Sequence, residues 1–198
     1  MHSLLCRFAQ GCVNKEIISR EDLDWLVYGL EKRISTAIVA IAFFLIGLKV
    51  TAMPTVISFL LCFYFLRVRT NGYHANSFIG CLIFSLILEL FFLIVLLPLL
   101  EFPILICLNT SSFIITFAFA PFANKSIHLD EDELIASRKT SRIRISLLSG
   151  IATILYALGA TEIGKGITLG NTMTALLLII AYIKEKGENK NEKRKQHL

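Results

Sequence analysis

Long apolar segments alternate with short charged ones along most of this chain, and this pattern constrains the fold more than any other feature. Hydrophobic residues make up 55% of the 198 positions and charged residues only 18%, which excludes an ordinary soluble domain and a disordered chain. A helix needs roughly 17 to 25 apolar residues to cross a bilayer. Segments of about that length are predicted as spans at 34–50, 52–68, 78–100, 102–123, 145–161 and 167–183. We therefore expect an all-α polytopic membrane helical bundle of about six transmembrane helices, a single membrane domain over residues 1–183 followed by a basic tail at 184–198.

The first two apolar segments are only weakly separated. Only Lys49, Thr51 and Pro54 separate the two segments, and each segment is at the lower length limit for a span. A re-entrant hairpin is a second interpretation of this region. Both interpretations return the chain to the side of the membrane on which it started.

Lysine and arginine residues determine the expected orientation, because positive residues near the ends of spans are retained in the cytoplasm. With six spans and a cytoplasmic N-terminus, 18 of the 20 Lys and Arg residues fall on the cytoplasmic side, and only Lys49 and Lys165 fall outside. Both termini, the 124–144 loop and the segment around His74 are expected to face the cytoplasm. This orientation, with attraction to anionic membrane lipid, accounts for the net charge of +5 without a nucleic-acid partner.

The parts of the chain outside the spans carry their own signals. Residues 1–33 mix apolar and charged residues around a break at Gly11, which predicts amphipathic helices on the membrane surface rather than a cleavable signal. The tail from Lys184 onward is rich in Lys, Glu and Asn and is predicted to be solvated and disordered. Before the fifth span, Asp130 and Glu133 are expected to cap a helix whose basic end leads into that span.

The cysteines give no sign of a metal site. No two of the five have the C-x-x-C spacing of a zinc or redox site, and the odd number argues against a disulfide framework. We expect no metal and no cofactor. Four cysteines are interpreted as small buried hydrophobes: Cys6, Cys12, Cys62 and Cys107.

The segment from Arg67 to Cys81 places two arginines, a histidine and a cysteine at the edge of an apolar span. A thiolate is the nucleophile in cysteine chemistry, and a nearby histidine, arginine or helix N-terminus favours it. An N-cap at Asn76 or Ser77 would place Cys81 at the positive end of a helix dipole. The segment therefore predicts a Cys-His pair at the cytoplasmic interface.

The seven-residue spacing between His74 and Cys81 restricts how the two side chains can meet. On one continuous helix it corresponds to about 10.5 Å of rise, too far for direct proton transfer. The pair therefore requires His74 on a loop that folds back over the helix start, and Asn71-Gly72 supplies residues that favour such a turn. The alternative is an interfacial histidine and an ordinary buried cysteine that are close only in sequence.

The chain resembles the accessory gene regulator B (AgrB) family of bacterial membrane cysteine endopeptidases. The resemblance rests on a basic residue, then Gly72-Tyr-His74-Ala, then a cysteine seven residues after the histidine at the start of a span. It extends to the amphipathic N-terminus, the number of predicted spans, and Pro121-Phe-Ala-Asn-Lys125 at the opening of a basic loop. It covers nearly the whole chain.

The resemblance implies a protease of the bacterial cell membrane that cuts an AgrD-like pheromone precursor in quorum sensing, with a homodimer as a reasonable assembly. By position, Cys81 would be its nucleophile and His74 its base. Two residues depart from the family pattern: Asn71, where a second glycine is common, and Ser126, where a proline is common. Asn tolerates left-handed backbone geometry, so the first departure is mild. Candidate positions for substrate contact or electrostatic support are Arg67, Arg69, Gly72, Ser77 and Lys125.

Two other functions are compatible with the sequence. A small membrane transporter or exporter would use Glu89, in the middle of the third predicted span, where a carboxylate is costly and usually faces the bundle interior. His74 and Cys81 would then be incidental, but no duplicated halves of the kind common in transporters are visible. A non-catalytic membrane scaffold is the third interpretation. In a peptidase, we assign Glu89 to packing or to an oligomer contact.

Overall fold

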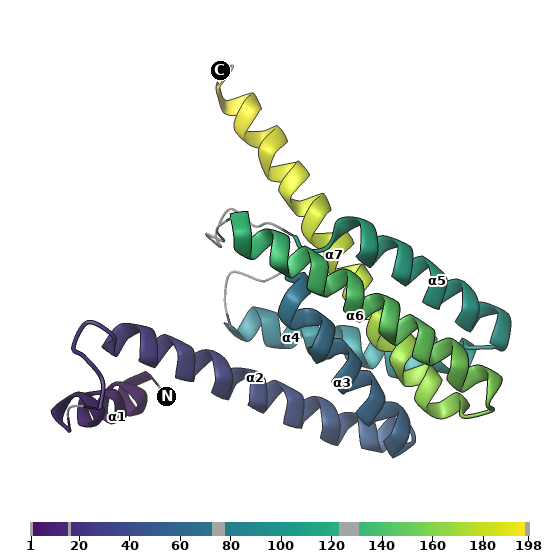
Figure 1. The fold of residues 1–198 in the computed structure, drawn as a ribbon, viewed down its shortest axis with the longest axis horizontal. Helices are drawn as coiled ribbons and strands as arrows, with labels where there is room; N and C mark the ends of the chain where they lie inside the picture. The colour runs from purple at the N-terminus through teal and green to yellow at the C-terminus, as the bar shows by residue number, and fades with distance from the viewer. Residues whose placement is uncertain (1, 16, 73–77, 123–130, 197–198) are drawn as a thin grey trace. The chain divides into compact units, whose positions relative to one another are not determined.

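The computed structural model describes residues 2–15, 17–72, 78–122 and 131–196, and all regular secondary structure within these ranges is helical. The expectation of an all-α chain is confirmed. The chain divides into two compact units, Met1–Leu45 and Ile46–Leu198, and each is described by itself. The helices of both are drawn in Figure 1.

The first unit contains α1, His2–Asn14, and most of α2, Leu23–Val50. α1 continues through Gly11, so the predicted break at this residue is wrong. A glycine weakens a helix by roughly 0.5–1 kcal/mol relative to alanine, which does not by itself end the helix. Leu4 and Phe8 are exposed and lie four residues apart on one face of α1. This apolar face suits the predicted position on the membrane surface.

α2 runs without interruption across the predicted boundary between residues 33 and 34. The interfacial segment and the first predicted span are therefore parts of one helix. Its apolar part, Ala37–Val50, is shorter than a full span. Whether this part crosses the membrane or forms half of a re-entrant hairpin stays a prediction.

The second unit contains the end of α2 and the remaining helices. They are α3 (Met53–Thr70), α4 (Phe78–Leu90), the π-helix η1 (Phe91–Leu96), the 3-10 helix η2 (Leu97–Leu99), α5 (Phe102–Phe119), α6 (Glu131–Ala157) and α7 (Thr161–Gln196). Pro54 and Pro103 stand at the starts of α3 and α5, where the missing N–H costs no hydrogen bond. Gly159 has φ 76° just after α6, the left-handed geometry in which many helices end.

Among the described residues, three helices are long and apolar enough to cross a membrane: α3, α5 and the Thr161–Gly187 part of α7. They coincide with the second, fourth and sixth predicted spans. The third predicted span falls on α4, η1 and η2, whose apolar part, Ile83–Leu99, is shorter. The fifth falls on α6, which is not among the three. A membrane location is supported, and a total of six crossings stays a prediction.

α3 and α7 run in the same direction, because contacts between them advance together along both helices. Thr55 Oγ1 donates to Glu162 Oε2 (2.7 Å) near the helix starts, and further along Cys62 Sγ donates to Asn171 Oδ1 (3.2 Å). α5 contacts α7 at Asn109–Asn171 and, further along both helices, at Phe119–Tyr182. α6 contacts α7 at Ser149–Asn171 and, further along α6 but earlier on α7, at Tyr156–Thr168. α5 is thus parallel to α7 and α6 is antiparallel. These directions agree with alternating crossings.

Two glycines on α7 allow α3 to approach closely. A β-carbon at Gly166 would collide with the Ser58 side chain and with the backbone of Thr55, and one at Gly170 would lie 2.9 Å from Cys62 Cβ. Their spacing of four residues places both on one helix face, the pattern by which membrane helices bring their backbones together.

Three buried residues and the half-buried Ser149 form a cluster, here called the Asn171 cluster, that joins α3, α5, α6 and α7. Asn171 Nδ2 donates to Asn109 Oδ1 (3.1 Å) and lies 3.4 Å from Ser149 Oγ. Asn171 Oδ1 accepts the hydrogen bond from Cys62, and Asn109 Nδ2 donates to the Ser149 carbonyl (3.1 Å). Of the four cysteines predicted to be buried, Cys62 is buried and also hydrogen-bonded, Cys6 and Cys12 are half-buried, and Cys107 is exposed, so the prediction is wrong for Cys107. In a low-dielectric interior, satisfied polar networks of this kind specify one arrangement of the helices.

The two long helices at the C-terminal end test two further expectations. α6 begins at Glu131 with an acidic first turn and continues into the fifth predicted span, which confirms the expected helix; the proposed capping residue Asp130 lies outside the described residues. α7 continues to Gln196, so the prediction of a disordered tail is wrong. Lys, Glu, Arg and Gln have high helix propensity, and the tail extends a helix that has already formed.

Candidate functional site

Cys81 is the fourth residue of α4, which begins at Phe78. Its backbone therefore lies in the first turn, where N–H groups have no partner within the helix and the helix dipole is positive. The side chain of Cys81, and the whole of His74, Ser77 and Lys125, lie outside the described residues. The described part of the site therefore consists of the elements on either side of these residues.

Both residues that are predicted to form a turn before His74 have positive φ angles. Asn71 has φ 55° and Gly72 has φ 109°, so both residues adopt backbone geometry that most side chains disfavour. Asn is the residue other than glycine that most readily accepts such geometry. α3 ends at Thr70, and Asn71 after it has ψ −130°. This combination lies outside the left-handed region that asparagine tolerates and favours glycine, so the expectation that Asn71 is only a mild departure is wrong.

Arg67 and Gly72 lie against each other at this turn. A β-carbon on Gly72 would collide with Arg67 Nη1 and would lie 3.5 Å from the Leu177 carbonyl oxygen of α7. Gly72 is buried. The Arg67 guanidinium thus packs over a position that has room only for hydrogen, and this contact is one reason for a glycine there.

The end of α3 is also attached to the segment that follows α5. Phe122 N donates to the Thr70 carbonyl (3.0 Å), and Asn71 Nδ2 lies 3.5 Å from the Phe122 carbonyl. Thr70 lies two residues before the end of the described range that precedes His74. Phe122 is the last residue of the described range that precedes Lys125. The two segments therefore begin from neighbouring points of the structure.

Arg69 lies apart from Arg67, beside α6. Two residues apart on a helix correspond to about 200° of rotation, so the two side chains leave α3 on different faces. Burial, and then the positive charge of Arg69, lower the pKa of Arg144 on α6 from its ordinary value. The structure thus brings Arg67 and Gly72 together, but it places Arg69 with Arg144.

A second arginine of α6 binds the end of α5. Arg142 Nε donates to the Phe117 carbonyl (3.2 Å), and its guanidinium lies 4.8 Å from the centre of the Phe117 ring. Arg142 and Arg144, with Arg67 and Arg69, make one end of the bundle basic. Within the described residues, no three His, Cys, Asp or Glu side chains are grouped as metal ligands would be.

A model of the accessory gene regulator B (AgrB) family matches residues 6–182 of the chain. The chain belongs to this family. No match was found among curated proteins or among solved structures. The matched region contains the turn at Asn71-Gly72, α4 with Cys81 and the whole basic end. AgrB membership ties the chain to the agr quorum-sensing system and, together with its apolar helices, to the membrane; the family is generally associated with peptide processing.

Glu89 of this AgrB chain is fully buried in α4, and neither carboxyl oxygen has a hydrogen-bond partner among the described residues. η1 begins two residues later. A buried carboxyl without a partner is costly, and π-helical turns occur often at functional sites. Because the chain itself covers this side chain, an oligomer contact through Glu89 is disfavoured relative to internal packing.

Sequence reasoning overlooked three features of the AgrB bundle: the Asn171 cluster, the pairing of Arg69 with Arg144, and the attachment of Phe122 to Thr70. All three join residues that are far apart in the chain, so no local signal indicates the pairing. The separation of Arg69 from Arg67 was foreseeable from the helical repeat alone.

Proposed function

We propose that this AgrB chain is a membrane-embedded cysteine endopeptidase that cleaves an AgrD-like peptide precursor, with Cys81 as the nucleophile and His74 as the base. The observation that carries the proposal is the position of Cys81 in the first turn of α4 in a chain matched by the AgrB model. A helix N-terminus favours the thiolate that such chemistry needs. The basic end of the bundle favours it further, because positive groups stabilise an anion.

The proposal makes a geometric demand on His74. A base must come within about 3 Å of the proton that it takes, directly or through one water. Seven residues along one helix would separate the pair by about 10.5 Å, so the histidine must reach Cys81 over the start of α4. The positive φ angles of Asn71 and Gly72 support this, because such backbone geometry is typical of tight turns.

The reaction follows from these roles. His74 takes the thiol proton, and the Cys81 thiolate attacks a peptide carbonyl of the precursor. The tetrahedral intermediate breaks the C–N bond, and His74 returns the proton to the leaving amine, which leaves an acyl-enzyme thioester. Backbone N–H groups between Ser77 and Cys81 are the candidate donors to the oxyanion.

The second nucleophile decides the product. Attack by water on the thioester releases a linear peptide. Attack by a cysteine or serine of the bound peptide releases a cyclic thiolactone or lactone and frees the Cys81 thiol in the same step. Cyclisation is favoured where the site excludes water and holds the internal nucleophile close to the thioester.

The supporting residues take different roles in this proposal. Arg67 acts as a positioning residue, because its guanidinium packs on Gly72 and fixes the turn before His74. Ser77 and Lys125 are proposed to contact the substrate. Arg69 contributes positive potential only, since it lies beside α6. The cytoplasmic face is the proposed side of the site, because a newly made precursor would meet it there.

Co-expression with a candidate precursor tests the proposal, with the peptide products identified by mass spectrometry. Cys81→Ala and His74→Ala should each abolish processing, because each removes an atom of the reacting pair. Cys107→Ala is the matched control, because Cys107 is a free, exposed cysteine on α5 and should leave processing unchanged. Normal processing by both Cys81→Ala and His74→Ala would refute the catalytic assignment.

A transporter is the second candidate function, because Glu89 is buried without a partner among the described residues. Intramembrane carboxyls of this kind occur in ion and proton pathways. Export of a peptide that is abolished by Glu89→Gln but retained in Cys81→Ala would favour transport over proteolysis. The peptidase proposal expects the reverse pattern in the same assay.

A further inference from the structure

The edge between α3 and α6 carries two arginines, Arg69 and Arg144. Ser141 Oγ of α6 donates to the Arg69 carbonyl (3.0 Å), and Arg69 is close enough to Arg144 to affect its ionisation. Within the described parts of the chain, no carboxylate forms an ion pair with either residue. Arg144 donates to the Phe65 carbonyl, and its guanidinium lies 4.0 Å from the centre of the Phe65 ring. Two guanidinium groups held close together in this way attract an anion.

An exposed apolar stripe on α3 leads directly to this pair. Leu61 and Phe65 are exposed and lie eight and four residues before Arg69, which is also exposed. Three side chains at this spacing span about 80° and share one helix face. Leu61 is turned about 100° from Cys62, which packs on α7, and the stripe belongs to a helix long and apolar enough to meet lipid.

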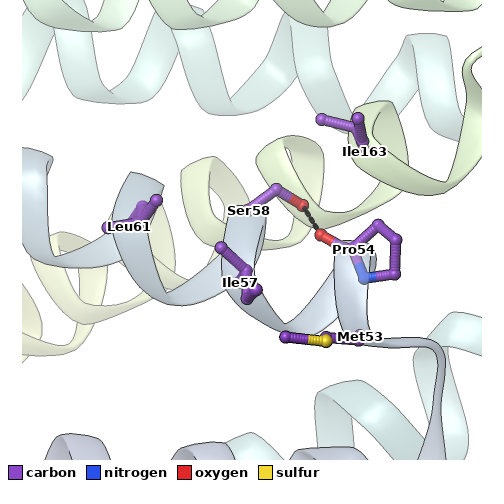
Figure 2. Close-up of a pocket in the computed structure, with 6 residues that line it drawn as sticks. All are labelled: Met53, Pro54, Ile57, Ser58, Leu61 and Ile163. Atoms are coloured by element: carbon purple, nitrogen blue, oxygen red, sulfur yellow. Dashed lines mark hydrogen bonds between the residues drawn. The ribbon is translucent and has the colours of Figure 1, made fainter.

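The stripe opens into an apolar hollow of about 430 Å³ between α3 and the start of α7. Figure 2 shows its lining, which consists of Met53, Pro54, Ile57, Ser58, Leu61 and Ile163. Ser58 Oγ, the one side-chain polar atom in this lining, donates to the Pro54 carbonyl of its own helix (2.7 Å). The hollow therefore presents apolar surface only.

The dimensions fit one leaflet of a bilayer. Leu61 lies eight residues before Arg69, which is about 12 Å along the helix. Half of a hydrocarbon core about 30 Å thick is about 15 Å. Because a headgroup phosphate lies outside the hydrocarbon core, an acyl chain would reach more than about 15 Å from the arginines, past Leu61 and into the hollow.

We propose that this groove binds one anionic phospholipid from the leaflet at the basic end of the bundle. The phosphate lies between Arg69 and Arg144, and one acyl chain follows Phe65 and Leu61 into the hollow. A soluble anion would contact only the two arginines, and the apolar stripe and the hollow would stay exposed. The proposal does not depend on the peptidase reaction.

Native mass spectrometry of the full chain tests the headgroup contact, with phosphatidylglycerol and phosphatidylcholine of identical acyl chains as competing lipids. The wild-type protein should retain one phosphatidylglycerol in preference to phosphatidylcholine. One arginine near a membrane surface contributes a preference of about fivefold, so R69Q/R144Q should lose about 25-fold. R138Q is the matched control, because Arg138 is an exposed arginine of the same helix and should keep the preference. An equal loss in R138Q would overturn the proposal.

The acyl contact needs a separate variant. Leu61→Ser should weaken retention of long-chain phosphatidylglycerol severalfold, whereas Ile114→Ser, on an equally exposed position of α5, should not. Each comparison is made between lipids within one variant, so a general loss of stability does not imitate the result. Displacement of the lipid by inorganic phosphate at equal concentration would identify a simple anion site and overturn the proposal.

Discussion

Gly72 shows at the scale of one residue how the backbone before the candidate base is determined. Its φ of 109° and the Arg67 guanidinium above it leave no room for a side chain. Asn71 beside it also has geometry that favours glycine, with φ 55° and ψ −130°, so a glycine there would relieve the backbone. The two residues of the turn should therefore respond differently to substitution.

Gly72→Ala should reduce precursor processing by tenfold or more. A left-handed alanine costs about 1–2 kcal/mol, and the new methyl group would also displace Arg67 from the turn. Asn71→Gly is the control and should process at close to the wild-type rate. Processing is measured by mass spectrometry at matched amounts of protein in the membrane. Wild-type activity in Gly72→Ala would show that this turn does not position His74.

At the scale of elements, the close contact of α3 with α7 holds the unit together. Gly166→Ala should lower the midpoint of thermal unfolding in detergent, because its β-carbon would collide with Ser58 and with the Thr55 backbone, and overpacking costs about 1–3 kcal/mol. Gly150→Ala is the matched control: nothing lies within 4 Å of a β-carbon there, and alanine stabilises an exposed helix position by about 0.5–1 kcal/mol. Equal midpoints for the two variants would contradict this packing.

The elements also show what the sequence can and cannot predict. The apolar segments, the prolines at helix starts and the Asn71-Gly72 turn are local signals, and the helices and the turn follow from them. The Asn171 cluster has no local signal, because Asn109 and Asn171 are 62 residues apart and each is tolerable alone. The charges of the tail predict disorder, but the same residues have high helix propensity, and α7 continues through the tail to Gln196.

At the scale of the whole molecule, the basic residues and the helix directions support one topology. α3, α5 and α7 point their C-terminal ends toward the end that carries Arg67 and Arg69, while Glu162 and Lys165 pair near the other end (3.0 Å). Positive residues are retained in the cytoplasm. The basic end should therefore be cytoplasmic.

A cysteine introduced at Arg138 in a chain without native cysteines should react with a membrane-impermeant thiol reagent in inside-out vesicles only. A cysteine at Lys165 should react only in right-side-out vesicles, because it marks the opposite end. The fraction labelled is read by mass shift. Labelling of both positions from the same side would rule out the alternating arrangement of α6 and α7.

The hydrogen bond from Phe122 to the Thr70 carbonyl has a consequence for the reach of the two segments that leave it. His74 lies four residues beyond Thr70, and Lys125 lies three beyond Phe122. An extended chain can carry them no further than about 14 Å and about 11 Å from these anchors. Two candidate residues 51 positions apart in the sequence can therefore lie no more than about 30 Å apart. An extended peptide of about nine residues is long enough to touch both even at that limit.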